Sequence, residues 1–299
     1  MDEHALDLLR QAYLVLTSGT FAYLVVVEGG NPDAPAPSKR WRHILRNLGL
    51  LVCLLVIFEV LILSQVFDIA SRLTDGSGLL KPLALAVSVQ FVVGLLLIDL
   101  FYYSFHRLTH RWRWLWLIHA VHHSDSELDA STGVRFHPAE TVISYLLVTA
   151  LLLALGLPLL VLLARAIVQN PIDLVQHANL RFPDWVERRL GWLLVTPRMH
   201  HVHHSPVPAE TNSNYGGMLS IWDRIFGTYA APAREGPRRY GLSKLVDDSW
   251  QSFGLVVARP RPSIPRVATV SARRVAQWQT IFPAEVEHGQ RPHCELRGN

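Results

Sequence analysis

Histidine is the residue type that stands out in this 299-residue chain, which has 15 histidines, 11 of them between positions 106 and 204. Eight fall into three clusters whose members lie three or four residues apart, the spacing of neighbours on one helix face. The clusters are His106 and His110; His119, His122 and His123; and His200, His203 and His204. Eight imidazoles exceed the four ligands of one tetrahedral zinc and suit two metal ions, and imidazole binds iron, zinc and copper alike. The spacing therefore predicts a metal centre and leaves the metal open.

Other polar residues near the clusters have several possible roles. Asp99 precedes His106 by seven residues, which is two helical turns. A carboxylate in a membrane helix needs a partner, so we expect Asp99 to orient the His106 imidazole. His137 stands before Pro138, where it either caps the next helix or joins the metal ligands. His201 breaks the spacing of the third cluster and is expected to face solvent.

The elements that must hold the clusters have the composition of membrane helices. Half of the residues are hydrophobic and 17% are charged, against about 25% in soluble domains. A membrane crossing needs about 20 mostly apolar residues. Such stretches occupy 8–27, 48–66 (with Glu59 inside), 83–101 and 141–164. Gly156 and Pro158 interrupt the last, so we expect a hairpin of 141–155 and 159–177, a single kinked span being the alternative.

The positions of Lys and Arg predict the orientation of these helices. The loop after the first stretch holds Lys39, Arg40, Arg42 and Arg46, and the segment after the third holds Arg107, Arg111 and Arg113. Short basic loops face the cytoplasm. A hairpin returns 177–204 to that same side, which is our reason for preferring it. The sequence thus predicts an all-α, multi-pass integral membrane protein with about four transmembrane segments and a cytoplasmic histidine-rich helical cap.

The remaining features bound the domains and the partners. We expect transmembrane helices over 1–94, a domain that holds the histidine clusters over 95–229, which the resemblance described below implies to be catalytic, and a Pro/Arg-rich tail, peripheral or partly disordered, over 230–299. The first stretch begins acidic, with no small-residue cleavage site after it, so we expect a retained helix. The net charge of +4 comes from arginines at the ends of apolar segments, which argues against a nucleic-acid partner. Cys53 and Cys294 lie too far apart to predict a cysteine metal site.

Several segments resemble the fatty acid hydroxylase/sterol desaturase superfamily of membrane non-haem di-iron enzymes. They are DLFYYSFHRLTH, HAVHHS, RFHPAE, QHAN, TPRMHHVHHS and NYGGMLSIWDRIFGTY, which together cover about 95–229. The resemblance implies two iron ions (the sequence leaves zinc open) that activate O2 to hydroxylate or desaturate a lipid substrate such as a fatty acyl chain or a sterol. The implied ligands are His106, His110, His119, His122, His123, His200, His203 and His204, with His177 of QHAN as a ninth.

Two of the similar segments contain further polar residues of interest. Asp173 stands one turn before His177, where some relatives have a histidine, so it would orient a ligand or bind metal through its carboxylate. In the last segment, Asn214 and Asp223 are expected to make structural hydrogen bonds.

The sequence has no evident haem, flavin or nicotinamide motif. Electrons would then come from a separate donor, such as a ferredoxin or a cytochrome b5-like protein with its reductase. Two other classes stay open at this point. A membrane zinc hydrolase lacks support because HExxH is absent and no glutamate lies within a cluster. A non-catalytic metal-binding membrane protein would need polar ligands inside the spans, where Asp99 and Glu59 are the clear candidates.

Overall fold

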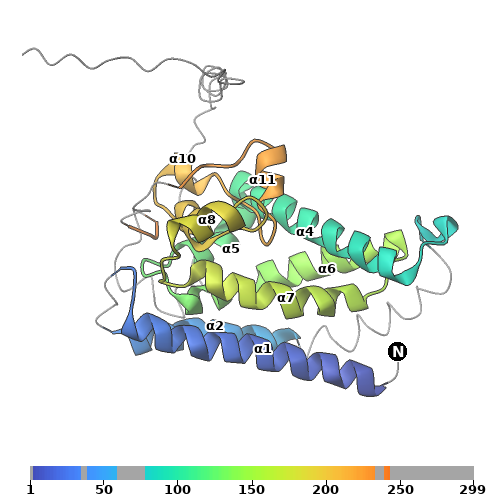
Figure 1. Cartoon of the computed structure of the whole chain (residues 1–299), viewed down its shortest axis with the longest axis horizontal. Coiled ribbons are helices and arrows are strands. Elements are labelled where there is room, and N and C mark those ends of the chain that lie inside the picture. The colour runs from blue at the N-terminus through green and yellow to red at the C-terminus, as the bar shows by residue number, and fades with distance from the viewer. Residues whose placement is uncertain (1–2, 35–38, 59–77, 233–238, 243–299) are drawn as a thin grey trace, which may run out of the picture. The chain divides into compact units, whose positions relative to one another are not determined.

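The computed structural model describes residues 3–34, 39–58, 78–232 and 239–242, and the regular elements in this part of the chain are helices joined by loops (Figure 1). The long helices are α1 (Glu3–Gly30), α2 (Arg40–Phe58), α4 (Val87–Arg111), α6 (Pro138–Leu155) and α7 (Leu160–His177). The shorter ones are α5 (Arg113–His123), α8 (Asp184–Leu190), α9 (Pro197–His203), α10 (Pro208–Thr211), α11 (Ile221–Ile225) and the 3-10 helices η2 (Lys81–Leu83) and η3 (Ala130–Val134). An isolated bridge between Leu194 and Leu219 is the only β-pairing among the described residues. The all-α prediction is confirmed for this part of the chain.

Three helices in the described part are long and apolar enough to cross a membrane: Asp7–Gly30, Val87–Arg111 and Pro138–Leu155. The predicted stretch 48–66 is described only as far as Phe58, and Glu59 lies outside the described residues. Helix α7 is not among the three, and it carries Arg165 and Asp173. The count of four transmembrane segments and the tail over 230–299, of which only 230–232 and 239–242 are described, stay predictions.

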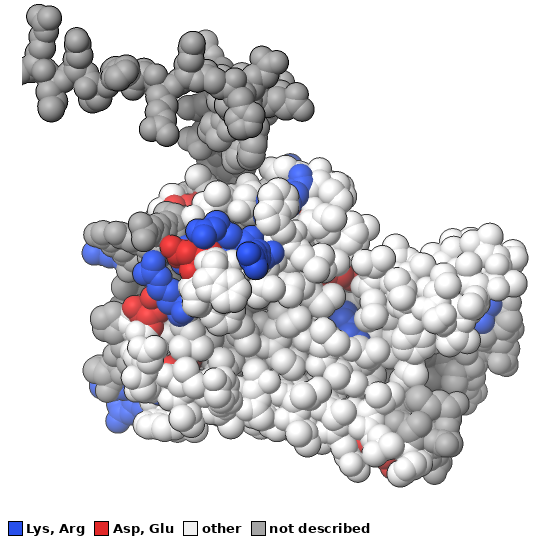
Figure 2. Space-filling model, in the orientation of Figure 1, with Lys and Arg blue, Asp and Glu red and all other residues white. Residues whose placement is uncertain are grey.

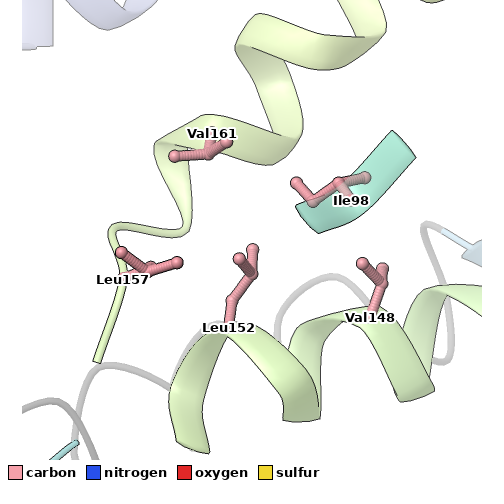
Figure 3. Packing of buried hydrophobic residues seen from close by; sticks show 5 residues of the cluster. All are labelled: Ile98, Val148, Leu152, Leu157 and Val161. Carbon is pink, nitrogen blue, oxygen red and sulfur yellow. The ribbon is translucent and has the colours of Figure 1, made fainter. Parts of the chain in front are cut away.

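Helices α6 and α7 form a hairpin. Gly156 ends α6 with a left-handed φ of 73°, a conformation that glycine adopts without steric cost. The chain then folds back, and side chains from both helices pack with Ile98 of α4 in one core whose members are at most 2% exposed (Figure 3). That core contains Ile98, Val148, Leu152, Leu157 and Val161. At Gly94, α4 lies so close to α7 that a Cβ atom would come within 2.9 Å of Val161. A single kinked span would not bring these residues together.

The long helices meet at one end of the bundle. The carboxylate of Glu28, near the end of α1, accepts hydrogen bonds from the amides of Ala130 and Asn179 at 2.9 and 2.8 Å. Asn47, near the start of α2, accepts a hydrogen bond from Arg135 at 2.8 Å. The loops after α1, α4 and the hairpin therefore lie on the same side, as the hairpin prediction requires. That this side is cytoplasmic stays a prediction.

Candidate metal centre

Nine histidines converge at this end of the bundle, from α4, α5, the last turn of α7, and α9 with the residue after it. Eight are buried and His106 is partly buried. They form two groups, and within each group the candidate ligand nitrogens lie within 4.8 Å of one another. The first group is His106, His110, His119, His123 and His203, and the second is His122, His177, His200 and His204. These are the nine residues that the sequence singled out, divided into two sets.

In the first group, backbone carbonyls hold the outward nitrogen of two imidazoles. Nδ1 of His106 lies 3.0 Å from the Tyr215 carbonyl oxygen, and Nδ1 of His203 lies 2.8 Å from that of Ser213. A carbonyl oxygen only accepts, so each Nδ1 carries the proton and each Nε2 presents a lone pair. Both Nε2 atoms are buried and have no hydrogen-bond partner. Two lone pairs thus point into the group with nothing from the described protein to bind them.

A carboxylate does the same for a third member of this group. Nδ1 of His119 donates to Oε1 of Glu140 at 2.7 Å, and the His119 Nε2 is buried and unpartnered. Glu140 belongs to the first turn of α6 and was missed by the sequence analysis. An acid in RFHPAE, at the start of an apolar helix, was the available signal, because such a group needs a partner.

In the second group, two imidazole lone pairs face each other. Nδ1 of His122 lies 3.2 Å from the Arg135 carbonyl oxygen, and Nδ1 of His177 lies 2.6 Å from that of Asp173. Their Nε2 atoms are 3.2 Å apart, and the His177 Nε2 is 2.8 Å from that of His200. The facing lone pairs of His122 and His177 repel at 3.2 Å unless a cation lies between them. The donor set therefore fits a metal ion that imidazole binds, such as iron, zinc or copper.

Burial keeps these imidazoles neutral. It lowers the pKa of His203 to about 3 and the pKa values of His122, His200 and His204 well below the usual value near 6.5. Neighbouring imidazoles of the clusters lower these values further, because charging one disfavours charging the next. Neutral imidazole is the form that binds metal, so these four imidazoles are available as ligands at neutral pH.

A residue of helix α2 is hydrogen-bonded to the residue whose carbonyl holds His122 of the second group. Arg135, whose carbonyl holds His122, is 1% exposed, and its guanidinium donates to Oδ1 of Asn47 at 2.8 Å. Asn47 in turn donates to Ser131 and Asp125, at 2.8 and 3.2 Å. The N-terminal helices therefore contribute hydrogen bonds to the surroundings of the histidines, a role that the sequence did not reveal.

The prediction that Asp99 orients His106 is wrong. The buried Asp99 carboxylate instead accepts the amides of residues 218–219 at 3.2 Å each and the indole N–H of Trp222 at 2.8 Å. Those partners come from a segment that packs against the middle of α4. Asp99 thus anchors the chain just after Tyr215, whose carbonyl is the group that holds His106.

His137 and Asp173 lie outside both groups. Nδ1 of His137 accepts the Ala139 amide at 3.1 Å, so this histidine caps α6, one of its two expected roles. The Asp173 carboxylate accepts the amide N–H of Gln169. Asp173 reaches His177 only through its backbone carbonyl, so neither expected role of its carboxylate is what the structure has.

The third cluster and the segment after it hold three structural residues. His201 is 5% exposed, and its Nδ1 lies 3.2 Å from the Tyr240 hydroxyl, so the expectation that it faces solvent is wrong. Asp223 accepts the amides of residues 215–216 at 2.8 and 2.7 Å. Asn214 bonds the backbone of Met199 and Ala230. The structural roles expected of Asn214 and Asp223 are confirmed.

Comparison with known proteins finds similarity over the part of the chain that holds the histidines. Residues 91–228 match the fatty acid hydroxylase family model. Over 160 residues the chain is 38% identical to ornithine lipid hydroxylase OlsE of Rhizobium tropici, covering 54% of this chain and 47% of that protein. It is 33% identical over 140 residues to alkylglycerol monooxygenase of Danio rerio (44% and 29%). It is also 33% identical over 139 residues to cholesterol 25-hydroxylase-like protein 1, member 2, of Danio rerio (46% and 49%).

The aligned part spans less than half the length of each of these relatives. No solved structure matches the chain significantly. The family match and the relatives agree over the segment that carries the histidine clusters, and over this segment the chain is similar to members of the fatty acid hydroxylase/sterol desaturase superfamily.

Proposed function

We propose that this protein is a membrane enzyme that uses O2 and two external electrons to hydroxylate a lipid, with one iron ion in each histidine group. The observation that carries the proposal is the pair of groups itself, in which imidazole nitrogens converge and the buried Nε2 atoms of His106, His119 and His203 have no hydrogen-bond partner. Nine imidazoles in two sets exceed what one ion can bind and suit two. The nine proposed ligands are the histidines of the two groups.

The residues of the chain would hold the metals and keep water out. The carbonyls of Tyr215, Ser213, Arg135 and Asp173 and the carboxylate of Glu140 fix the imidazole tautomers, so that each lone pair points inward. Iron bound there would supply the activation of O2. The near-complete burial of the groups limits access by water, which suits a reaction at an unactivated C–H bond.

The balance of the reaction explains why a partner is needed. Hydroxylation of a C–H bond by O2 takes up two electrons and two protons and releases one water beside the alcohol. The sequence has no evident nicotinamide or flavin motif, so we propose a separate donor, a ferredoxin or a cytochrome b5-like protein with its reductase. The active site would face the cytoplasm, where such donors occur.

The names of the relatives support the substrate class. Two are named for ornithine lipid and alkylglycerol as substrates, and the third is named as similar to a cholesterol hydroxylase; all three of these substrates are amphipathic lipids. We propose that this chain takes a lipid whose apolar part reaches the histidines from the bilayer. Hydroxylation is proposed over desaturation because each of these relatives is named as a hydroxylase or monooxygenase.

Metal analysis and lipid profiling test the proposal together. Protein purified in detergent should contain two irons per chain and consume O2 when given reductant and lipid. Cells that express it should contain a lipid 16 mass units heavier than its precursor. Cells that express the matched variant with both His122→Ala and His203→Ala should contain only the precursor. Zinc without O2 uptake would indicate a hydrolase instead, and a loss of two mass units would indicate a desaturase.

A further inference from the structure

Helix α11 packs against the middle of α4. The Trp222 indole donates to Asp99 at 2.8 Å, and the Phe226 ring stacks on Tyr103 with centroids 5.3 Å apart. Asp99 lies half-way along the 25-residue helix α4, about 18 Å from either end. If α4 enters the hydrocarbon at Val87, the core extends over about 20 residues and includes both contact points. With this placement of α4, helix α11 lies beside the part of α4 that is inside the membrane.

The side of α11 that faces away from α4 is also apolar. Ile221 and Ile225 share one helix face, and Ile225 is 60% exposed. Large apolar side chains of the preceding segment are exposed too, among them Trp192 at 69% and Leu193 at 59%. We call the exposed set the collar: Leu190, Trp192, Leu193, Ile221, Ile225 and Phe226.

The two parts of the collar form one surface. The amide of Ser220 donates to the Leu193 carbonyl at 3.0 Å. The neighbouring residues Leu194 and Leu219 pair in an antiparallel bridge. The Arg224 guanidinium donates to the Gly191 carbonyl at 2.8 Å. The segment around 190–194 is thus fixed against the segment around 219–226.

Basic side chains adjoin the collar on the side of α8. The Arg224 guanidinium lies 4.5 Å from the centre of the Trp192 ring, and the last turn of α8 holds Arg188 and Arg189. On the face shown in Figure 2, Lys and Arg side chains, with Asp and Glu side chains between them, gather over the region of α8, whereas the surface along α7 and α1 is mostly uncharged. Tryptophan paired with arginine beside an apolar surface is the composition of a protein that sits at the boundary between lipid headgroups and hydrocarbon.

We propose that the collar is embedded in the bilayer leaflet on the histidine side of the membrane. Hydrocarbon covers Leu193, Ile221 and Ile225, and Arg224 with Trp192 lies among the phosphates of the headgroups. The cap would then not stand wholly above the membrane but sink into it beside α4. This inference rests on the membrane placement of α4 and not on the proposed chemistry.

The collar is close enough to the histidines to matter for substrate access. Tyr215 belongs to the same segment, and its ring centroid lies 5.6 Å from those of His106 and His203. The Tyr215 amide is held by Asp223 of α11 at 2.8 Å. The rings of Tyr103 and Tyr215, with centroids 6.4 Å apart, therefore connect Phe226 of the collar to the first histidine group.

Quenching by spin-labelled lipid tests the proposal on the full chain. With Cys53 and Cys294 replaced by serine, a single cysteine is introduced as Ile225→Cys and, in a second variant, as Leu193→Cys, and each is labelled with bimane. The protein is reconstituted into phosphatidylcholine–phosphatidylglycerol vesicles with or without phosphatidylcholine bearing a doxyl group on its acyl chain. Val92→Cys on the exposed face of α4 serves as the lipid-facing control and Ala209→Cys on α10 as the water-facing one.

The collar predicts quenching at 225 and 193 of at least half that at Val92→Cys, and slow reaction of both cysteines with a water-soluble maleimide. Quenching no greater than at Ala209→Cys, with fast reaction, would overturn it. Weak quenching with slow reaction would also overturn it, because a second copy or another segment of this chain would then cover the collar, and disulfide cross-linking between copies would identify the former. Both readouts are independent of bound metal and of activity, so a failure here leaves the proposed function standing.

Discussion

Glu140 and His119 are joined by a hydrogen bond of 2.7 Å between Oε1 and Nδ1, which links the first turn of the α6–α7 hairpin to helix α5. The opposite nitrogen, Nε2 of His119, is buried among four other histidines and has no hydrogen-bond partner. A carboxylate on one ring nitrogen fixes the tautomer and raises the basicity of the other. In the first group, the Glu140 carboxylate is therefore the side chain that fixes the tautomer of a candidate metal ligand and raises the basicity of its Nε2.

Replacing Glu140 should therefore weaken the metal site without unfolding the protein. Glu140→Gln keeps one acceptor but loses the charge, and we expect metal affinity or activity to fall about 10–100-fold, with Glu140→Ala at or beyond the upper end. The measurements are metal content after dialysis against a graded chelator and the rate of lipid hydroxylation. Glu210→Gln on α10 is the matched control and should change neither. Full metal retention in Glu140→Ala would contradict the assigned role.

The division into two groups predicts two separable losses of metal. His203→Ala removes one nitrogen from the first group and His122→Ala one from the second. Each should release about one ion per chain and abolish activity, and the double variant should release both. His4→Ala, at an exposed position in α1, should retain two ions. Two ions in the double variant would show that these imidazoles are not ligands.

His137→Ala separates capping from ligation. Because His137 accepts the Ala139 amide at the start of α6, its loss should cost about 1 kcal/mol of stability and leave the metal in place. Thermal unfolding in detergent and metal analysis of the same sample give both values. Loss of one ion with unchanged stability would make His137 a ligand after all.

The convergence of the nine histidines was predictable because helical spacing is a local property. Positions three and four apart share a face whatever the rest of the chain does, and the segment QHAN extended the set by resemblance. The prediction for Asp99 was wrong because the partners of Asp99 are set by tertiary packing and not by local spacing. They lie about 120 residues later in the chain. Spacing placed His201 off the shared face of its cluster, but it could not reveal that Tyr240 covers that side.

The observed partners of Asp99 predict a coupled loss of stability. Asp99→Leu leaves two amides and the Trp222 indole without an acceptor, which should cost about 1–3 kcal/mol for each group that stays buried. Trp222→Phe removes one of these donors and should cost less in the Asp99→Leu background than in the wild type. Unfolding of the four proteins in detergent gives the coupling energy, which we expect to exceed about 0.5 kcal/mol. Additive effects would mean that the contact does not stabilise the protein.

The proposed orientation predicts which ends of the bundle can be labelled from the cytoplasm. A cysteine introduced as Ala209→Cys lies at the histidine end, and one introduced as Lys81→Cys lies near Gly156 at the other end, where residues 79–80 bond the end of α6. In sealed inverted vesicles, an impermeant maleimide should label the first and not the second. The reverse pattern would overturn the orientation derived from the Lys and Arg counts.

The surroundings of His43 predict a decline of stability at alkaline pH. Burial alone would lower the pKa of His43, but Asp125 and Asp129 outweigh it and raise this pKa to about 9. A folded pKa above the unfolded value near 6.5 means that the ion pairs stabilise fully below pH 6.5. That contribution, up to about 3 kcal/mol, is lost as the pH rises through 9. These ion pairs predict a measurable difference between the wild type and His43→Gln, which cannot be charged. The unfolding temperature should fall from pH 6.5 to 9.5 more steeply for the wild type than for this variant. Because Asn47 ties Asp125 to Arg135, the carbonyl partner of His122, metal retention should weaken over that range in the wild type as well. Parallel unfolding curves for the two proteins would show that His43 is neutral in the folded state.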